Sequence, residues 1–169
     1  KYLEELSILV TGGGGSIGSE LVSQFYLTNL KKIIVIDNSE YNLFKIQDKI
    51  NQLAEYKKNK KTEISFHLSD VSDENIIKNF KDEKIDGIFH AAAYKHVDLV
   101  ENNVFSGVKN NIFSCYYLCK HFYHKNLKFF VLVSTDKAVR PKSVMGITKN
   151  ISERIVNYYN SITRTKFYS

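Results

Sequence analysis

Titratable side chains follow directly after a long apolar run in the last third of the chain. Thr135, Asp136 and Lys137 end this run, and Met145 and Lys149 lie four residues apart further on. We expect the first three at the junction between a buried strand and a helix. Met145 and Lys149 would share one face of that helix, because residues four apart are neighbours on a helix surface. A carboxyl and an amine at such a junction are suited to general acid–base chemistry.

A glycine-rich turn follows the first apolar run, with Gly12, Gly15 and Gly18 in a G-x-x-G-x-x-G pattern. In dinucleotide-binding folds one glycine permits the tight turn, one lets the backbone approach a pyrophosphate and one lets the helix pack on the strand. The helix that begins near Ser16 would present free N–H groups and its positive end to the phosphates. We therefore expect these glycines, with Ser16 and Ile17, to bind a dinucleotide. A P-loop is excluded, because the last glycine is not followed by Lys and then Ser or Thr.

An acidic residue ends the second apolar run. Asp37 lies 19 residues after Gly18, close to the spacing of about 20 for the acid that binds the adenosine ribose. A carboxylate there accepts hydrogen bonds from the ribose hydroxyls and repels a 2′-phosphate, which predicts NAD rather than NADP. A helix-capping role for Asp37 is the alternative. The other expected cofactor contacts lie at the ends of the third and fourth predicted strands or directly after them: Asp70, Val71, Ala91 and Ala92.

Strand-like and helix-like patterns alternate along the whole chain. Alternation of this kind indicates a parallel sheet with helices on both faces, so we predict an α/β, Rossmann-type, doubly wound fold in one domain over residues 1–169. The predicted strands are 6–11, 32–37, 63–70, 86–93 and 127–135, with a sixth beginning in 163–169, and the predicted helices are 16–29, 41–54, 75–80, 102–125 and 144–161.

Composition places the chain among globular proteins. It has 169 residues, 43% apolar and 25% charged, which suits one domain and is too short for two of ordinary size. No apolar run approaches the roughly 20 residues of a membrane span, and no signal peptide opens the chain, so we expect a soluble protein. The net charge is +6, and its densest cluster is Lys57–Lys61. We interpret this cluster as a solvated loop, with attraction to a phosphorylated ligand or an anionic membrane as the alternative. No nucleic-acid-binding module is apparent.

Two cysteines and two histidines lie close together in the predicted helix 102–125. At about 100° per residue, Cys119 lies roughly 40° from Cys115, whereas His124 lies roughly 180° from it. Together with His121 these side chains cannot converge on one tetrahedral metal ion. We therefore expect no metal site, and we expect the cysteines to be small core residues in a protein of a reducing compartment.

Short-chain dehydrogenases and their nucleotide-sugar relatives carry a Tyr-x-x-x-Lys pair on the helix after the fifth strand. The lysine holds the nicotinamide ribose and lowers the tyrosine pKa, and the tyrosine moves the proton. In this position the chain has Met145 and Lys149, so that the lysine is present and the phenol is absent. Matches elsewhere precede the fifth strand, and we interpret them as coincidences: Tyr41/Lys45, Tyr56/Lys60 and Tyr116/Lys120.

Several motifs together resemble the nucleotide-sugar 4,6-dehydratases of bacterial polysaccharide and glycoprotein synthesis. These are extended short-chain dehydrogenases that act on UDP-N-acetylglucosamine. The similar segments are VTGGGGSIGSEL, VIDNSEYNL, LSDV, FHAAAYKHVDLVE, GVKNNIF and FVLVSTDKAVRPKSVMGITK. The resemblance is closest to the long, membrane-anchored branch, in which methionine commonly replaces the tyrosine. Two departures are Asp98, where the family usually has proline, and Val104, where Asn-Pro is usual.

The resemblance implies a mechanism that begins and ends at the cofactor. NAD takes a hydride from C4 of the sugar, water leaves from C5 and C6, and the hydride returns to C6. Lys137 would be the base at C5, which needs a pKa lowered toward about 7–8, and Asp136 the acid at the C6 hydroxyl, which needs a raised pKa. Met145 would only shape the pocket. The proton of the C4 hydroxyl would go to Asp136, Thr135 or an ordered water, and a surface Asp–Lys pair capping a turn is the alternative to catalysis.

The remaining expectations concern the substrate and the intact protein. Lys95 and His96 follow the fourth strand. Lys95 would meet a phosphate or the sugar, and His96 would either contact the substrate or be structural. Asn111 matches a family asparagine that supports the site. The resemblance implies that most of the UDP-sugar pocket lies beyond Ser169, so we expect this chain alone to bind NAD without turnover. An epimerase of the same fold, an isolated NAD-binding domain and a module that binds polyanions are the alternatives. We expect a cytoplasmic homo-oligomer when the protein is intact, with any membrane anchor preceding Lys1.

Overall fold

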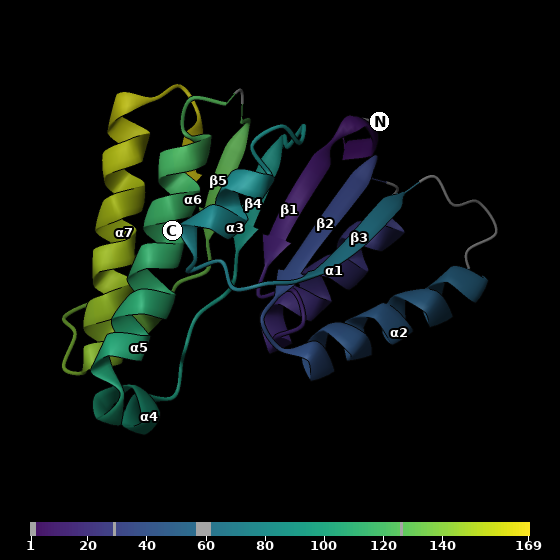
Figure 1. Ribbon diagram of the computed structural model, residues 1–169. Helices are drawn as coiled ribbons and strands as arrows, with labels where there is room; N and C mark the ends of the chain where they lie inside the picture. Colours follow the sequence, from purple (N-terminus) through teal and green to yellow (C-terminus); the bar gives the residue numbers. More distant parts are fainter. Residues whose placement is uncertain (1–2, 29, 57–61, 126) are drawn as a thin grey trace.

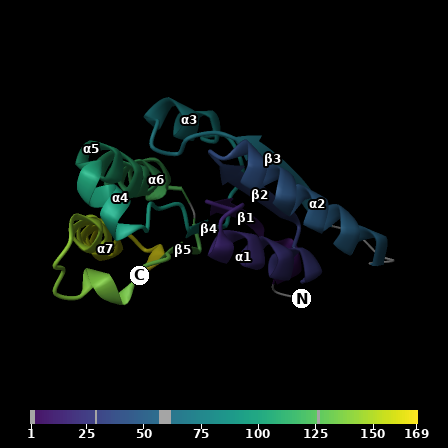
Figure 2. The ribbon, with the colours of Figure 1, turned by 90° about the horizontal axis from the view of Figure 1, so that it is seen from below.

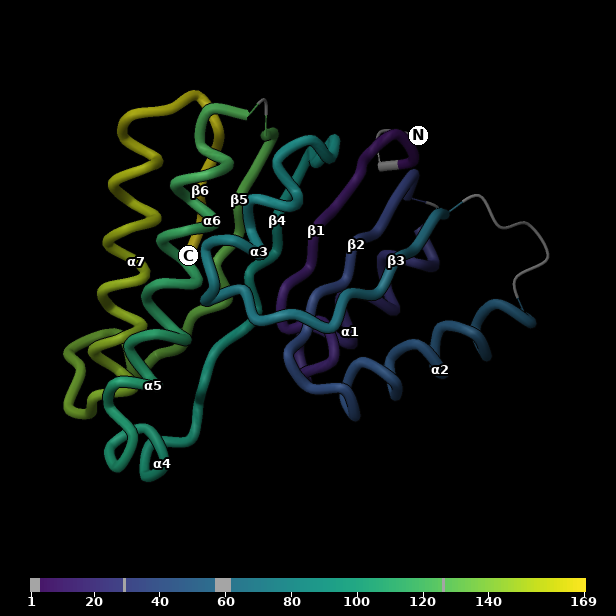
Figure 3. Tube along the Cα trace, in the orientation of Figure 1, coloured from purple at the N-terminus to yellow at the C-terminus, as the bar shows by residue number. Residues whose placement is uncertain are grey.

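The computed structural model describes residues 3–28, 30–56, 62–125 and 127–169. The lysine cluster 57–61 and Lys60 of the second Tyr–Lys match therefore lie outside the described residues. Six strands form one parallel sheet in the order β3-β2-β1-β4-β5-β6 (Figures 1 and 3). The strands are β1 (Ser7–Thr11), β2 (Lys32–Asp37), β3 (Glu63–Leu68), β4 (Gly87–His90), β5 (Phe129–Leu132) and β6 (Lys166–Tyr168).

Helices cover both faces of this sheet, which confirms the predicted fold class (Figure 2). Buried side chains of α1 and α2 share a core with one face, and those of α3, α6 and α7 share a core with the other. None of the described helices is both long and apolar enough to cross a bilayer. The helices are α1 (Ser16–Leu27), α2 (Glu40–Tyr56), α3 (Glu74–Asn79), α4 (Val97–Asn102), α5 (Val104–Val108), a π turn (Lys109–Phe113), α6 (Ser114–Phe122) and α7 (Val144–Ile162), with single 3₁₀ turns at Leu3–Glu5 and Asp136–Ala138.

The central strand β1 is buried on both faces, as its unbroken apolar sequence indicates. Ile8 and Val10 point into the core beneath α1 and α2, and Leu9 points into the opposite core. Val10 pairs with Val35 of β2 on one side and Phe89 of β4 on the other. Because all strands are parallel, their carboxyl ends meet at one edge of the sheet, where ligands bind in folds of this kind.

The predicted helix 102–125 is wrong in its boundaries. It is preceded by the separate helix α4, and Asn103, with φ −137° and ψ 54°, breaks the chain before Val104. From Val104 the chain is helical to Phe122, but with the π turn inserted between α5 and α6. Asp98 lies in the first turn of α4, and Val104 is the first residue of α5. Both helices therefore form without the proline residues that the dehydratase family usually has at these positions.

Three predicted strands end earlier in the structure. The run 63–70 pairs in the sheet only to Leu68, the run 86–93 only to His90, and the run 127–135 only to Leu132. Beyond these residues the chain turns along the cavities described below, and its apolar side chains line these cavities instead of pairing with a sheet neighbour. The predicted sixth strand is β6, which pairs with β5.

Candidate functional site

The glycine loop between β1 and α1 is held between two neighbouring segments. Gly12 has φ +67°, a left-handed conformation that favours glycine. A Cβ at this position would lie 2.5 Å from the backbone nitrogen of Ala92. On the other side, the Gly13 N–H donates to the carbonyl of Ile36 (3.1 Å). The loop is therefore fixed between the carboxyl ends of β2 and β4.

Gly15 and Gly18 differ in what surrounds them. A Cβ at Gly18 would lie 2.0 Å from the carbonyl oxygen of Gly12, so α1 packs directly on the loop. A Cβ at Gly15 would meet only that same oxygen, at 3.2 Å, and Gly15 lines two adjoining cavities. The geometry thus separates a packing glycine from one that leaves room for a ligand to approach the backbone.

The amino end of α1 is open to a ligand. Gly15 is the residue before the helix, and it provides no side-chain cap for the N–H groups of the first turn. These groups have no partner within a helix, and they carry the positive end of the helix dipole. A diphosphate fits this end. The cavity beside it, here the α1 cavity, is lined by Gly12, Gly14, Gly15, Ser16, Ile17, Gly18, Ser19, Asn42, Lys45, Ile46, Asp48, Lys49, Gln52, Ala91, Ala93, Lys95 and His96.

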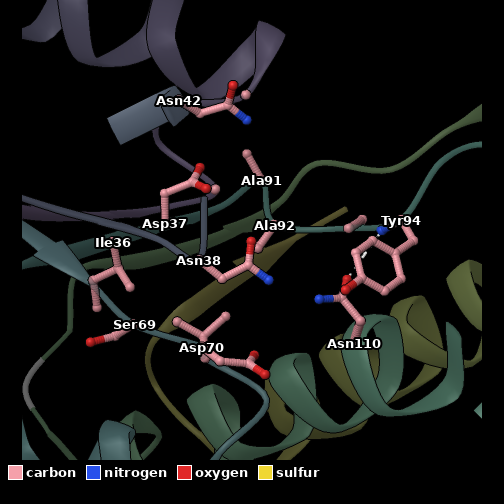
Figure 4. Close-up of a pocket in the computed structure, with 14 residues that line it drawn as sticks. Ile36, Asp37, Asn38, Asn42, Ser69, Asp70, Ala91, Ala92, Tyr94 and Asn110 are labelled. Carbon is pink, nitrogen blue, oxygen red and sulfur yellow. Dashed lines mark hydrogen bonds between the residues drawn. The ribbon is translucent and has the colours of Figure 1, made fainter. Parts of the chain in front are cut away.

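Asp37 ends β2 beside the glycine loop. One carboxylate oxygen accepts the N–H of Gly14 (2.9 Å) and the other accepts the N–H of Ser39 (2.9 Å). Each carboxylate oxygen has two lone pairs, so two acceptor positions remain for ribose hydroxyls. Figure 4 shows this cavity, here the glycine-loop cavity, which is lined by Gly12, Gly15, Ile36, Asp37, Asn38, Asn42, Ser69, Asp70, Val71, Ala91, Ala92, Ala93, Tyr94 and Asn110.

The far end of the glycine-loop cavity lies after β3. Asp70 accepts hydrogen bonds from the backbone N–H (2.8 Å) and the hydroxyl (2.7 Å) of Ser72 through one carboxylate oxygen. This turn holds Val71, which is 4% exposed, in the cavity wall. This end of the cavity could hold a base such as adenine, and Asp37 could hold its ribose.

A third cavity, here the β5 cavity, brings together most of the predicted catalytic residues. It lies after β5 and faces the first turns of α1 and α7. Asp136 is not among its lining residues. These are Ile17, Ala91, Ala93, Tyr94, Lys95, Val133, Ser134, Thr135, Lys137, Met145 and Lys149.

Lys149 is the buried cation of the β5 cavity. Its side chain is 5% exposed, and its ammonium donates to the carbonyl of Val133 (2.6 Å). Burial lowers the pKa of Lys149, and the nearby thiol of Cys115 and carboxyl of Glu153 oppose this shift. Met145, one helical turn earlier, is 3% exposed and lines the same cavity. An ammonium has three donors, so two remain for a ribose.

Thr135, Asp136 and Lys137 form a compact turn at the cavity mouth. The Thr135 hydroxyl donates to the exposed carboxylate of Asp136 (3.0 Å) and accepts the N–H of Lys137 (3.4 Å). The carbonyl of Lys137 lies against α7, where a Cβ at Gly146 would be 2.5 Å from it. The turn therefore depends on glycine at position 146.

The loop after β4 is fastened by two asparagines of the π turn. The N–H of Tyr94 donates to the side-chain oxygens of both Asn110 (3.1 Å) and Asn111 (2.7 Å). The amide of Asn111 also donates to the Tyr94 carbonyl (3.1 Å) and to the Thr148 hydroxyl on α7 (2.9 Å). Asn111 therefore supports the loop as expected. The exposed Lys95 of this loop lines both the α1 and β5 cavities.

Sequence reasoning missed two residues of this region. Asn110 lines the glycine-loop cavity, whereas only its neighbour Asn111 was predicted from the sequence to have a role. His90, the last residue of β4, is 1% exposed and hydrogen-bonded on both ring nitrogens. A polar residue that ends an otherwise apolar strand was the available signal.

Other residues considered from the sequence lie elsewhere. The Tyr41/Lys45 pair lies on α2, where the lysine ammonium is 5.0 Å from the centroid of the tyrosine ring. The Tyr116/Lys120 pair lies on α6, where the corresponding distance is 5.8 Å. Cys115 and Cys119 are buried in the core of α3, α6 and α7, and His121 bonds to Glu74 (2.8 Å). Within the described residues, no three or more His, Cys, Asp or Glu side chains are grouped to hold a metal ion.

Comparison with known proteins gives a family match over nearly the whole chain. Residues 8–169 match the family described as "Polysaccharide biosynthesis protein". The chain is 37% identical to the probable polysaccharide biosynthesis protein EpsC of Bacillus subtilis, covering 95% of this chain and 26% of that protein. It is 30% identical to the UDP-N-acetylglucosamine 4,6-dehydratase (inverting) of Campylobacter jejuni, covering 95% and 45%. It is also 30% identical to a UDP-glucose 4-epimerase of Rickettsia bellii, covering 88% and 42%.

A solved structure shows the same architecture. The X-ray structure of Pen from Bacillus thuringiensis superposes with a TM-score of 0.86 at 27% identity, covering 99% of this chain and 51% of that one. The chain thus spans about half of that protein, and less than half of each of the three relatives above.

Proposed function

The chain belongs to the polysaccharide biosynthesis protein family, and on this premise we propose that it forms the NAD-binding half of a nucleotide-sugar 4,6-dehydratase. The substrate is a UDP-sugar, UDP-N-acetylglucosamine in our proposal. The observation that carries the proposal is the β5 cavity, where Thr135, Lys137 and Lys149 are grouped around a methionine in place of a phenol.

Three features of the chain support NAD as the cofactor. The uncapped first turn of α1 suits the diphosphate, Asp37 retains acceptor positions for two ribose hydroxyls, and Lys149 retains donors for the second ribose. The carboxylate of Asp37 also disfavours a 2′-phosphate, which carries like charge. NAD, when bound, supplies oxidation at C4 of the sugar and the matching reduction at C6.

The chain's own groups can move the protons. The Thr135 hydroxyl, which already donates to Asp136, passes the proton of the C4 hydroxyl to that carboxylate. Lys137 removes the C5 proton once C4 is a ketone. Asp136 then protonates the departing C6 hydroxyl, which leaves as water, and Lys137 returns a proton to C5. One proton passes from the C4 hydroxyl to the water released, so the sequence balances without a phenol.

A C4 epimerase is the second candidate, because relatives of the chain are named UDP-glucose 4-epimerase. An epimerase needs proton transfer only at the C4 oxygen, and it would leave Lys137 without a chemical duty. The position of Lys137 in the cavity wall favours dehydration. The full-length protein is the proposed enzyme, and we expect residues 1–169 alone to bind NAD without turnover. We further propose a cytoplasmic homo-oligomer, in which any membrane anchor lies outside this chain.

Mass spectrometry separates the two candidates. The full-length protein is incubated with UDP-N-acetylglucosamine and NAD, and the mass of the sugar nucleotide is followed. Loss of one water supports the dehydratase. An isomer of unchanged mass would establish the epimerase instead, and a Thr135→Val variant, which retains shape but not the hydroxyl, should lose most of the dehydration.

A further inference from the structure

A buried histidine lies between the glycine loop and the π turn, and none of the proposed chemical steps uses it. The Nδ1 atom of His90 is 2.7 Å from the hydroxyl of Thr11, the last residue of β1. Its Nε2 atom is 3.2 Å from the hydroxyl of Ser114, the first residue of α6. All three side chains are almost fully buried, with exposures of 0–1%.

The direction of these hydrogen bonds follows from the last acceptor. The Ser114 hydroxyl donates to the carbonyl of Asn110, and a carbonyl oxygen can only accept. Having one hydrogen, Ser114 must accept from His90, so Nε2 carries the proton and Nδ1 accepts from Thr11. The ring is assigned as the neutral Nε2–H tautomer from this network. Burial, assisted by the nearby Lys149 ammonium, lowers the pKa of His90 to about 3, which agrees with a neutral ring.

The chain of hydrogen bonds reaches the site loop. The Ser114 hydroxyl donates to the backbone carbonyl of Asn110. A side chain that inserts into the backbone hydrogen bonds of a helix is one cause of local irregularity. Adjacent helical residues point about 100° apart, yet within this π turn the side chains of both Asn110 and Asn111 reach the N–H of Tyr94. Figure 4 shows the Asn110 side chain next to Tyr94 at the edge of the glycine-loop cavity.

We propose that His90 is a positioning residue that ties the end of β1 to the π turn, and thereby holds the Tyr94–Lys95 backbone in the site. Apolar packing alone does not make this link, because each step is a directed hydrogen bond between different elements. Its importance for turnover rests on the proposed function and on the expected contact of Lys95 with a phosphate or the sugar of the substrate.

Two variants test the two halves of the link. Glutamine can place its amide nitrogen near the position of Nε2, so His90→Gln keeps a donor for Ser114. Asparagine is shorter and places its oxygen near Nδ1, so His90→Asn keeps the acceptor for Thr11 and loses Ser114. The pair is matched in chemistry and differs by one methylene, and His90→Leu removes both hydrogen bonds.

Amide hydrogen exchange reads the result at Tyr94, with the amides of Ile34 and Ile36 in β2 as the internal reference. In the Asn and Leu variants we expect the Tyr94 amide to exchange roughly tenfold faster, the scale of losing one buried hydrogen bond with its partner left unpaired. In the Gln variant it should stay within about threefold of the wild type. The β2 amides should be unchanged in all three.

Three outcomes would overturn the proposal. The first is an equal exchange rate of the Tyr94 amide in the Gln and Asn variants, and the second is a wild-type rate of this amide in the Leu variant. The third is an acceleration of the β2 amides that equals that of the Tyr94 amide, which would mean a general loss of stability. The measurement needs no substrate. A full-length protein that fails to dehydrate the UDP-sugar would therefore reject the proposed function and leave the His90 result standing.

Discussion

Replacement of two glycines of the same loop by alanine should have different effects: Gly15→Ala should lose cofactor affinity, and Gly18→Ala should lose stability. Gly15 has φ −70° and ψ 174°, which alanine adopts freely, and its added methyl group would meet only the Gly12 oxygen at 3.2 Å. Gly15→Ala should therefore change the free energy of unfolding by less than about 1 kcal/mol. The methyl group would project where the two cavities join, and the diphosphate would lose its close approach to the backbone.

The expected loss of NADH affinity follows from the contacts at stake. A hydrogen bond from a backbone N–H group to a phosphate contributes about 1.5–3 kcal/mol, so the loss of one such bond in Gly15→Ala should weaken binding roughly 10- to 100-fold. Gly18→Ala would place Cβ 2.0 Å from the carbonyl oxygen of Gly12, so the backbone of the loop or of α1 must shift. Overpacking of this kind costs about 1–3 kcal/mol or more. The melting temperature should fall by about 2–4 °C for each kcal/mol lost.

Thermal unfolding and NADH titration together test this pair. The chain contains no tryptophan, so binding is followed by the fluorescence of NADH itself. We expect Gly15→Ala to melt like the wild type and bind NADH weakly, and Gly18→Ala to melt earlier. Wild-type affinity in Gly15→Ala, or an equal loss of stability in both variants, would refute the roles derived for the two glycines.

Three further predictions follow from the site. Asp37→Asn removes the charge but keeps one acceptor, so calorimetric titration should show NADH affinity reduced about tenfold and NADPH affinity undiminished; equal losses would argue against contact with the ribose. Gly146→Ala would place Cβ 2.5 Å from the Lys137 carbonyl oxygen and displace the turn that carries Thr135 and Lys137. Turnover of the full-length protein should therefore fall about tenfold while the NADH affinity stays constant. A parallel loss of NADH affinity would contradict a local effect on this turn. The pKa of His90 is lowered from 6.5 to about 3, so between these two values the unfolded chain binds a proton that the folded chain does not, and stability must fall as the pH falls. Denaturant titrations at pH 6.5 and 4.5 should show that the free energy of unfolding falls by about 2 kcal/mol more in the wild type than in His90→Gln. Identical losses in the two proteins would contradict a buried neutral ring.

Local sequence was sufficient where one segment determines its own structure. The unbroken apolar run before Gly12 predicts a strand buried on both faces, and the glycines after it predict the tight turn into α1. Asp37 could be placed because the distance from Gly18 to the next strand end is set by one βαβ unit. These features depend on short-range spacing, which the sequence displays directly.

Long-range contacts decided what the sequence did not reveal. The helical pattern of 102–125 continues through the π turn without a visible break, and the Ser114 side chain at its end bonds to His90, which is distant in the sequence. The alanines after His90 looked like strand residues, because an apolar cavity wall and an apolar core have the same composition. Asn110 gave no signal, since its partner Tyr94 is 16 residues away on another element.

The measurement that tests the account most directly is deuterium incorporation at C5 of the sugar. The full-length protein and its Lys137→Met variant are incubated with UDP-N-acetylglucosamine and NAD in heavy water, and the position of the label is determined by NMR. We predict that the wild type forms a dehydrated product with deuterium at C5, and that the variant incorporates none. Deuterium at C5 in the variant at the wild-type rate would contradict the assignment of Lys137 as the base.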